Sequence, residues 1–352
     1  VEVVVWNYFQ PGPRRKHQKK FAGGRTGSTQ KCDVPMRILL TNINSKLYAT
    51  EKNGTPVRDR LITETIRTMA DVLFMSETGA KTGKEIEFVT VEKDTGKPEQ
   101  VVILSAGSGE GTNEEILWEN EQPKREGVAV ILRGKAKLGW TAAGERWERV
   151  SGRIMWVDIH MGPNLGIVRH FIIYHPTAKN VIGAKRFWHE LEHAIEAAEA
   201  DEHVKMWAAH GDWNSRLIVA DIPENQRGKY AEQDLITDAP GVAENAAQMT
   251  SFILDRDLAV LHTQHNETKP QTFTQLNTGR EMTYDMSVMP KQVGANKNII
   301  RSGTRVLTRH QFDYDSRGED ADDHKVVQTM WQMNWSREDA RKAAEERKAR
   351  DK

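Results

Sequence analysis

The chain has 352 residues, is 38% hydrophobic and 28% charged, and carries 50 basic against 50 acidic residues. This composition is typical of a globular protein with a sizeable core. It excludes a disordered or fibrous chain and, because no run of about eighteen apolar residues occurs, a membrane span. The single cysteine, Cys32, excludes an internal disulfide framework and predicts an intracellular protein, for which the nucleus is one location.

The first 35 residues are predicted to form a basic, flexible arm. The sequence starts without a methionine or a basic lead-in, so it does not match a signal peptide. Such a start fits excision from a larger polyprotein and equally a shortened sequence. Basic residues between positions 11 and 31 can neutralise nucleic-acid phosphates, although a solubilising tail has the same composition. They are Arg14, Arg15, Lys16, Lys19, Lys20, Arg25 and Lys31.

From residue 36 the pattern of apolar residues alternates between strands and helices. Short runs of β-branched and aromatic residues indicate strands, and apolar residues that recur on one face indicate helices. The predicted strands are 37–43, 71–75, 128–132, 154–160, 168–174, 205–210, 258–262 and 283–289, and the predicted helices are 60–70, 184–200 and 249–258.

Two further segments carry no chemistry that the sequence reveals. Residues 82–122 are charged and contain glycine, which indicates an insertion or a long hairpin. The mixed-charge run 336–352 predicts a surface helix. The predicted organisation is therefore an arm at 1–35, one main domain at 36–330, and a charged helix or tail at 331–352.

Several predicted strands end in polar residues. In layered α/β proteins such strand ends gather at one edge of the sheets and form the active site. Singly, each has an ordinary explanation: residues 42–44 or Asp212 as turns, Glu77 as a helix cap, and residues 323–324 as a solvated loop. Their order is more specific. It runs from an Asn-Ile-Asn strand end through a Glu, a Tyr-x-Pro, a Gly-Asp-x-Asn and a Tyr-Asp strand to a late Asp-His.

This order resembles the DNase I-like endonuclease/exonuclease/phosphatase superfamily over about residues 36–328. The resemblance implies a four-layer α/β sandwich of two packed mixed β-sheets flanked by helices, which agrees with the alternation described above. The motifs that carry it are TNIN (41–44), DVLFMSET (71–78), GVAVIL (127–132), SGRIMWVDI (151–159), IIYHP (172–176), HGDWN (210–214), MTYDMSVM (282–289) and DDHKVV (322–327).

The resemblance and the chemistry of phosphodiester cleavage together imply a site for Mg²⁺ or Mn²⁺. The reaction needs an activated water, a cation near the phosphoryl oxygens and donors to the transition state. Glu77 is the expected metal ligand, because its hard oxygens leave other positions on the metal open. Asn44 and Asp323 are expected to complete or support this site.

His324 is expected to exchange a proton or to donate to a phosphate oxygen. Asp285 would fix its tautomer and raise its basicity. Asp212 is a candidate for the base that activates water, and the His324–Asp285 pair is the alternative.

Three more residues are expected to contact or orient the phosphate. Asn214 and Asn42 would hydrogen-bond the phosphate or orient neighbouring groups, and Tyr174 would donate to the scissile phosphate or pack beside it.

The sequence departs from the superfamily pattern in three places. Ser76 stands where a glutamine commonly precedes the metal-binding glutamate, and Thr177 stands where an asparagine often follows Tyr-x-Pro. Asn44 stands where apurinic endonucleases often carry an aspartate, and a neutral amide would bind metal less strongly.

Nucleic acid, most of all DNA, is the expected substrate. The basic arm favours it, the inositol-phosphatase signature Pro-Ala-Trp-Cys-Asp-Arg is absent around Asp285, and residues 254–275 resemble the endonucleases of non-LTR retrotransposons. In that family a Thr-Phe-Thr precedes the Asp strand, as residues 272–274 do here, although an ordinary strand explains them too.

The predicted function is a Mg²⁺-dependent endonuclease that leaves 3′-hydroxyl and 5′-phosphate ends, of retroelement type or, second, of apurinic type. The alternatives are a phosphatase or phosphodiesterase for a small or lipid phosphoester and a catalytically inactive nucleic-acid-binding module. No protein partner is predicted.

Overall fold

The structure is a computed structural model, and most of the predicted main domain falls within the residues that it describes. Residues 5–34 of the predicted basic arm lie outside them, and so do its residues Arg14, Arg15, Lys16, Lys19 and Lys20; Asp323 also lies outside them. The described residues are 3–4, 35–51, 54–80, 83–92, 98–107, 126–163, 165–231, 241–265, 271–275, 280–296, 299–300, 305–307, 311–312, 324–332, 341–342, 345–346 and 349.

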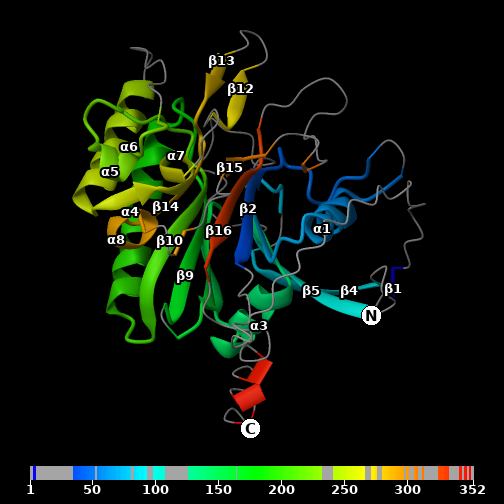
Figure 1. The fold of residues 1–352 in the computed structure, drawn as a ribbon. Coiled ribbons are helices and arrows are strands. Elements are labelled where there is room, and N and C mark those ends of the chain that lie inside the picture. The colour runs from blue at the N-terminus through cyan, green and yellow to red at the C-terminus, as the bar shows by residue number, and fades with distance from the viewer. Residues whose placement is uncertain are drawn as a thin grey trace, which may run out of the picture.

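The larger of two packed sheets has eight strands in the order β1-β4-β5-β6-β3-β2-β16-β15 (Figure 1). It is mixed: β2 and β3 run parallel, as do β1 and β4, and the other neighbours are antiparallel. The strands are β1 (Val3–Val4), β2 (Met36–Asn42), β3 (Val72–Ser76), β4 (Glu85–Glu92), β5 (Pro98–Ala106), β6 (Val128–Leu132), β15 (Arg305–Val306) and β16 (Val327–Trp331).

The second sheet has six strands in the order β11-β14-β10-β9-β8-β7. Here β9 and β10 are parallel, and their neighbours are antiparallel. A separate hairpin, β12–β13, stands above the two sheets in Figure 1. The strands are β7 (Trp147–Ser151), β8 (Ile154–His160), β9 (Ile167–Tyr174), β10 (Val204–Asp212), β11 (Leu258–Val260), β12 (Phe273–Gln275), β13 (Arg280–Met282) and β14 (Asp285–Pro290).

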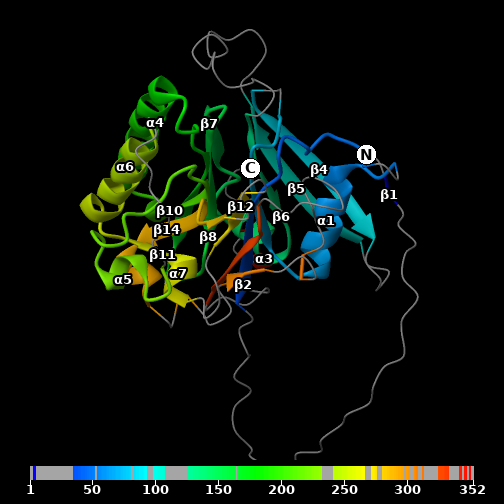
Figure 2. The same ribbon diagram turned by 90° about the horizontal axis from the view of Figure 1, so that it is seen from above.

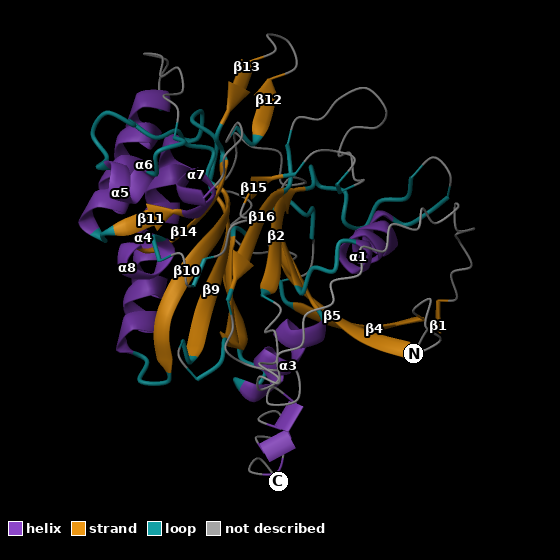
Figure 3. Cartoon of the chain, in the orientation of Figure 1, coloured by secondary structure: helices purple, strands orange, loops and turns teal. Residues whose placement is uncertain are grey.

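Helices cover the outer faces of both sheets (Figures 2 and 3). Figure 2 shows α4 and α6 outside the six-stranded sheet and α1 outside the eight-stranded sheet. Within the described part of the chain, no helix combines the length and apolar composition needed to cross a membrane. The helices are α1 (Val57–Arg67), α3 (Gly134–Ala142), α4 (Val181–Ala200), α5 (Glu224–Arg227), α6 (Val242–Asp255), α7 (Leu261–His265) and α8 (Lys291–Gly294).

Three apolar layers hold the sandwich together. Phe74 and Val130 of the larger sheet meet Ile172 of the smaller sheet in the central layer. Leu191 of α4 packs in the second layer on the outer face of the smaller sheet, and Leu61 of α1 packs in the third layer against the larger sheet. Two mixed sheets flanked by helices confirm the predicted fold class.

Most predicted elements occur, but some of their boundaries were wrong. The helix predicted at 60–70 is α1 (Val57–Arg67), and Met69 lies beyond its end with a positive φ of 55° and a side chain that is 70% exposed. The strand predicted at 258–262 stops at Val260, where α7 begins. Part of the segment 82–122 forms the β4–β5 hairpin, and the described residues after 336 are helical.

The sheet topology brings the polar strand ends to one edge. The parallel pairs β2–β3 and β9–β10 place Asn42 beside Ser76 and Tyr174 beside Asp212. Because β14 and β16 run antiparallel to their neighbours, it is their first residues that reach this edge. Asp285 begins β14 opposite Asp212, and His324 precedes β16. Residues far apart in the sequence therefore meet at one end of the sandwich.

A buried histidine pair lies between the sheets. His170 Nδ1 and His210 Nε2 are 3.0 Å apart, and His210 Nδ1 is 2.9 Å from Ser287 Oγ. The His210 ring stacks on Phe74 at 4.5 Å between centroids. Burial lowers the pKa of His170 to about 3 and holds the pKa of His210 well below its usual value, so both rings are neutral.

We predict that these histidines make the fold sensitive to acid. Burial also lowers the pKa of His175 to about 3. Below pH 6.5 these histidines therefore bind protons in the unfolded chain but not in the folded chain. The free energy of unfolding falls by roughly 1.4 kcal/mol for each histidine with each unit that the pH is lowered. Chemical denaturation between pH 7.5 and 5 measures this slope.

The substitution His170→Gln isolates one of these contributions, because it removes a single titrating group. The variant should lose stability less steeply between pH 6 and 5 than the parent chain. Equal slopes in the two proteins would contradict the assignment. Carboxylates with raised pKa values, such as Asp212, oppose the trend in both proteins and cancel in the comparison.

Candidate active site

The side-chain amide of Asn42 connects carboxylates from both sheets. Its Nδ2 donates to Glu77 Oε2 at 3.0 Å and to Asp212 Oδ2 at 2.9 Å. Its Oδ1 accepts the backbone N–H of Asn44 at 2.9 Å, which orients the amide. Asn42, Glu77 and Asp212 are all buried. Two carboxylates are thus held close together by a neutral donor.

Three residues of the site adopt the left-handed backbone conformation, which is uncommon outside glycine. The φ angles are 49° at Asn44, 50° at Glu77 and 41° at Asn214. Asparagine tolerates this region, but for glutamate it costs energy that the surrounding structure has to supply. Backbone hydrogen bonds supply it: the Glu77 carbonyl accepts from Ser45 at 2.6 Å, and the next N–H donates to the Gly127 carbonyl at 2.9 Å.

Gly211 allows β9 and β10 to approach closely just before Asp212. A Cβ at this position would lie 1.9 Å from the carbonyl oxygen of Ile173, which no side chain permits. The backbone N–H of Asn214 then donates to Asp212 Oδ1 at 2.8 Å. The Asn214 side chain donates to the His175 carbonyl at 2.8 Å and to Asp212 Oδ2 at 3.3 Å. Asp212 is therefore fixed from both sides.

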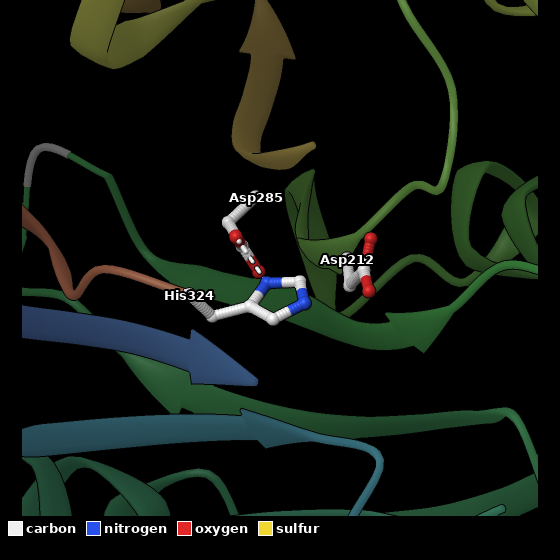
Figure 4. Close-up of side chains that lie close together, drawn as sticks. All are labelled: Asp212, Asp285 and His324. Atoms are coloured by element: carbon white, nitrogen blue, oxygen red, sulfur yellow. Dashed lines mark hydrogen bonds and ion pairs between the residues drawn. The ribbon is translucent and has the colours of Figure 1, made fainter. Parts of the chain in front are cut away.

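His324 forms a second pair with Asp285. Its Nδ1 lies 2.9 Å from Asp285 Oδ2, and Asp285 is fully buried. Figure 4 shows the ring between the two aspartates, with the other ring nitrogen on the side of Asp212. A carboxylate at Nδ1 favours the tautomer with the proton there, which leaves Nε2 as the acceptor.

Asp212, Asp285 and His324 are close enough to act on one atom. One ligand atom from each lies within 4.8 Å of the others. Burial, followed by repulsion from Asp285, raises the pKa of Asp212 to about 7. A carboxyl group with this pKa can take or give a proton near neutral pH.

Tyr174 lies at the end of β9 beside a buried arginine. The Arg153 guanidinium sits 4.8 Å from the centroid of the Tyr174 ring, and its Nε lies 3.4 Å from Glu126 Oε1. Both partners of this ion pair are buried. The arrangement places a positive charge against the ring at the edge where the acidic residues meet.

The structure brings most of the predicted site residues together. Asn42, Glu77, Asp212 and Asn214 form one hydrogen-bonded group, and Asp285 with His324 forms the adjacent pair. Asn44 joins the first group through its backbone, and Tyr174 is the strand partner of Asp212. Asp323 and the arm residues lie outside the described residues, so their predicted roles stay predictions.

Two residues of the site had no role in the sequence-based prediction. Arg153 stands in the SGRIMWVDI motif, and its position before a strand could have indicated a buried cation. Thr272 was noted only as part of Thr-Phe-Thr. In the structure it is fully buried, and its Oγ1 accepts the backbone N–H of Asp285 at 2.8 Å.

The two packed mixed sheets and the flanking helices match the DNase I-like endonuclease/exonuclease/phosphatase fold of solved structures. The resemblance seen in the sequence is confirmed at this level.

Among solved structures, the AP endonuclease LMAP from Leishmania major matches with a TM-score of 0.54 and 11% identity, over 89% of this chain and 92% of that one. The endonuclease domain of TRAS1, a telomere-specific non-LTR retrotransposon, matches with a TM-score of 0.48 and 13% identity, over 85% of this chain and 100% of that one. The 3′ phosphatase NExo from Neisseria, bound to a product DNA hairpin, matches with a TM-score of 0.47 and 14% identity, over 85% of this chain and 100% of that one. No protein-family model and no curated protein matches the sequence.

We predict that Asn42→Asp destabilises the fold. The change replaces a neutral donor by a third buried carboxyl group between Glu77 and Asp212. In the absence of divalent metal it should lower the free energy of unfolding by about 3 kcal/mol at pH 8. The cost should shrink at pH 5, because burial raises the pKa of the added group and protonation removes its charge. Urea denaturation at both pH values measures the difference.

Asn180→Asp is the matched control. Asn180 is also buried, but its Oδ1 caps α4 by accepting the N–H of Gly183 at 2.8 Å, and a carboxylate keeps this bond. Its effect should stay below about 1 kcal/mol. Equal losses in the two variants would show that the Asn42 amide has no special importance.

Proposed function

We propose that this chain is a divalent-metal-dependent phosphodiesterase that nicks DNA and leaves 3′-hydroxyl and 5′-phosphate ends. The observation that carries the proposal is the meeting of two acidic groups at one edge of the sandwich: Glu77 and Asp212 joined by Asn42, and Asp285 paired with His324. Such a set can position a phosphodiester, exchange protons and hold a cation, the three requirements of phosphoryl transfer.

The donor set fits a hard divalent cation such as Mg²⁺ or Mn²⁺. Glu77 presents a buried carboxylate that receives a neutral amide hydrogen bond, and the backbone N–H of Asn44 donates to the Asn42 side chain. With Asp323 they would hold the ion, and Asp212, Asp285 and His324 offer a second donor group. When bound, the cation supplies positive charge for the phosphoryl oxygens and lowers the pKa of water.

The protein's own groups would orient the phosphate and move the proton. Asp285 fixes the His324 ring, whose Nε2 side faces Asp212. Either this pair or Asp212, with its raised pKa, would accept the proton of the attacking water. Both hydrogen bonds of Asn42 Nδ2 go to carboxylates, which favours its orienting role over direct phosphate binding. Asn214 and Tyr174 would contact the phosphate from the second sheet.

The proposed DNA substrate rests on the basic arm, on the Thr-Phe-Thr segment and on the fold. A retroelement-type nicking enzyme is the first form of the proposal. Cleavage at apurinic sites is the second, because an AP endonuclease shares the fold. An intracellular location is part of the same proposal, with the nucleus as one location, and it rests on the single cysteine.

We expect the protein to nick supercoiled plasmid in Mg²⁺ but not in EDTA. Glu77→Ala and His324→Ala should each reduce the rate by at least roughly 100-fold, because each removes a group that acts on the reacting phosphate. The measurement is the rate of conversion to the relaxed form. A rate that both variants leave unchanged would refute the assigned site.

Glu202→Ala and His203→Ala are matched controls, because they remove a glutamate and a histidine side chain from an exposed turn. Their side chains are 90% and 66% exposed, and both should nick as the parent does. If the folded parent does not nick, the proposal passes to a phosphatase for a smaller ester, to be tested on nucleotides and phosphoinositides. Salt-sensitive DNA binding without any turnover would instead identify a binding module.

We expect deletion of residues 11–31 to weaken DNA binding and to flatten its salt dependence. The segment carries seven basic residues and no acidic one, and each phosphate contact contributes about 0.9 to the slope of log K against log salt. Fluorescence anisotropy at several salt concentrations measures this slope. A variant of full length with the seven residues replaced by glutamine should behave like the deletion. An unchanged slope in both would exclude the arm from binding.

A further inference from the structure

Thr272 forms hydrogen bonds to the backbone segments that carry the two members of the His324–Asp285 pair. Its Oγ1 accepts two backbone N–H groups, from Tyr284 at 3.0 Å and from Asp285 at 2.8 Å. Its own N–H donates to the Met282 carbonyl at 2.9 Å. These three bonds fix the start of β14, and with it the backbone that carries the Asp285 carboxylate.

The same residue also holds the segment that carries His324. The Thr272 carbonyl accepts the backbone N–H of Lys325 at 2.7 Å, and Phe273 forms an isolated antiparallel bridge with His324. The rings of Phe273 and His324 lie 4.8 Å apart. Thr272 therefore contacts the six-stranded sheet with its hydroxyl, and with its carbonyl it contacts the segment that precedes β16 of the eight-stranded sheet.

The hydrogen bond between His324 and Asp285 closes this arrangement into a ring. The ring runs from Thr272 Oγ1 to the Asp285 backbone, through its carboxylate to His324 Nδ1, and back along the chain to Lys325 and the Thr272 carbonyl. Thr272 is fully buried, so water does not compete for these bonds.

We infer that Thr272 is a positioning residue for the His324–Asp285 pair, an inference that rests on the proposed function. Its hydroxyl sets the position of Asp285 relative to the imidazole, and Phe273 fixes the plane of the ring. Removal of the hydroxyl leaves the N–H groups of Tyr284 and Asp285 without this acceptor and lets the start of β14 move. A displacement of the pair by a fraction of an ångström slows the chemical step and leaves substrate binding intact.

The test compares Thr272→Val with Thr272→Ser. Valine keeps the shape and removes the acceptor, whereas serine keeps the acceptor and removes one methyl group. With a fluorescent duplex substrate in Mg²⁺, Thr272→Val should lower kcat by roughly 10- to 100-fold and leave KM within about twofold. Thr272→Ser should keep the kcat of the parent.

Thr250→Val is the matched control for loss of a buried hydrogen bond. Thr250 is also buried, and its Oγ1 accepts the backbone N–H of Ile218 at 3.1 Å on the outer side of the six-stranded sheet. This variant should lose comparable thermal stability and keep the kcat of the parent. Equal losses of kcat in both valine variants would reduce the role of Thr272 to stability and overturn the inference.

An NMR measurement tests the inference without any activity. The ¹H–¹³C correlations of the His324 ring, identified as those that His324→Gln removes, report its position against the Phe273 ring. Thr272→Val should shift them, and Thr272→Ser and Thr250→Val should not. If the protein cuts no DNA, this shift still supports the positioning role. Unshifted resonances in Thr272→Val overturn it, whether or not the protein is a nuclease.

Discussion

The amide of Asn42 sets the constraint on which the rest of the structure depends, because it joins a carboxylate from each sheet. Glu77 follows β3 of the larger sheet, and Asp212 ends β10 of the smaller one. Two buried carboxylates repel each other unless a donor lies between them. The two sheets must therefore meet with their edges aligned to within hydrogen-bonding distance, and the apolar layer between them fixes this alignment.

The sequence predicted strand bounds well where the residues are fully buried. It did not predict the role of a residue where that role depends on which residues it contacts in the folded chain. The strand 128–132 was predicted to the residue, because an apolar run buried on both faces tolerates few alternatives, and the strand 154–160 was also predicted to the residue. Helix α3, with two glycines in nine residues and no clear apolar face, was missed. The identities of Glu77, Asp212 and His324 followed from motifs. The roles of Arg153 and Thr272 did not, since they depend on contacts between segments that only folding brings together.

Polar groups inside this sandwich serve two opposite purposes. Between the sheets, His170 and His210 are held neutral and hydrogen-bond to each other within an aromatic surrounding, so they add specificity to the packing. At the edge, burial raises the pKa of Asp212, and a left-handed backbone at Glu77 is kept in place by its neighbours. Backbone strain and like charges occur together at this edge. Both lower the stability of the fold, and both are typical of functional sites.

The position of β16 has a consequence for the newly made chain. Among the described residues this strand is the last in sequence, yet it lies between β2 and β15 and begins three residues after His324. Its partner β2 is synthesised nearly 300 residues earlier, and the edge of β2 that pairs with β16 stays exposed until β16 is made. A polypeptide interrupted before this point lacks both the closing strand and the imidazole. Translation thus completes this edge of the sheet and supplies the His324 imidazole within a few residues of each other, and a chain that stops before residue 324 lacks the His324–Asp285 pair.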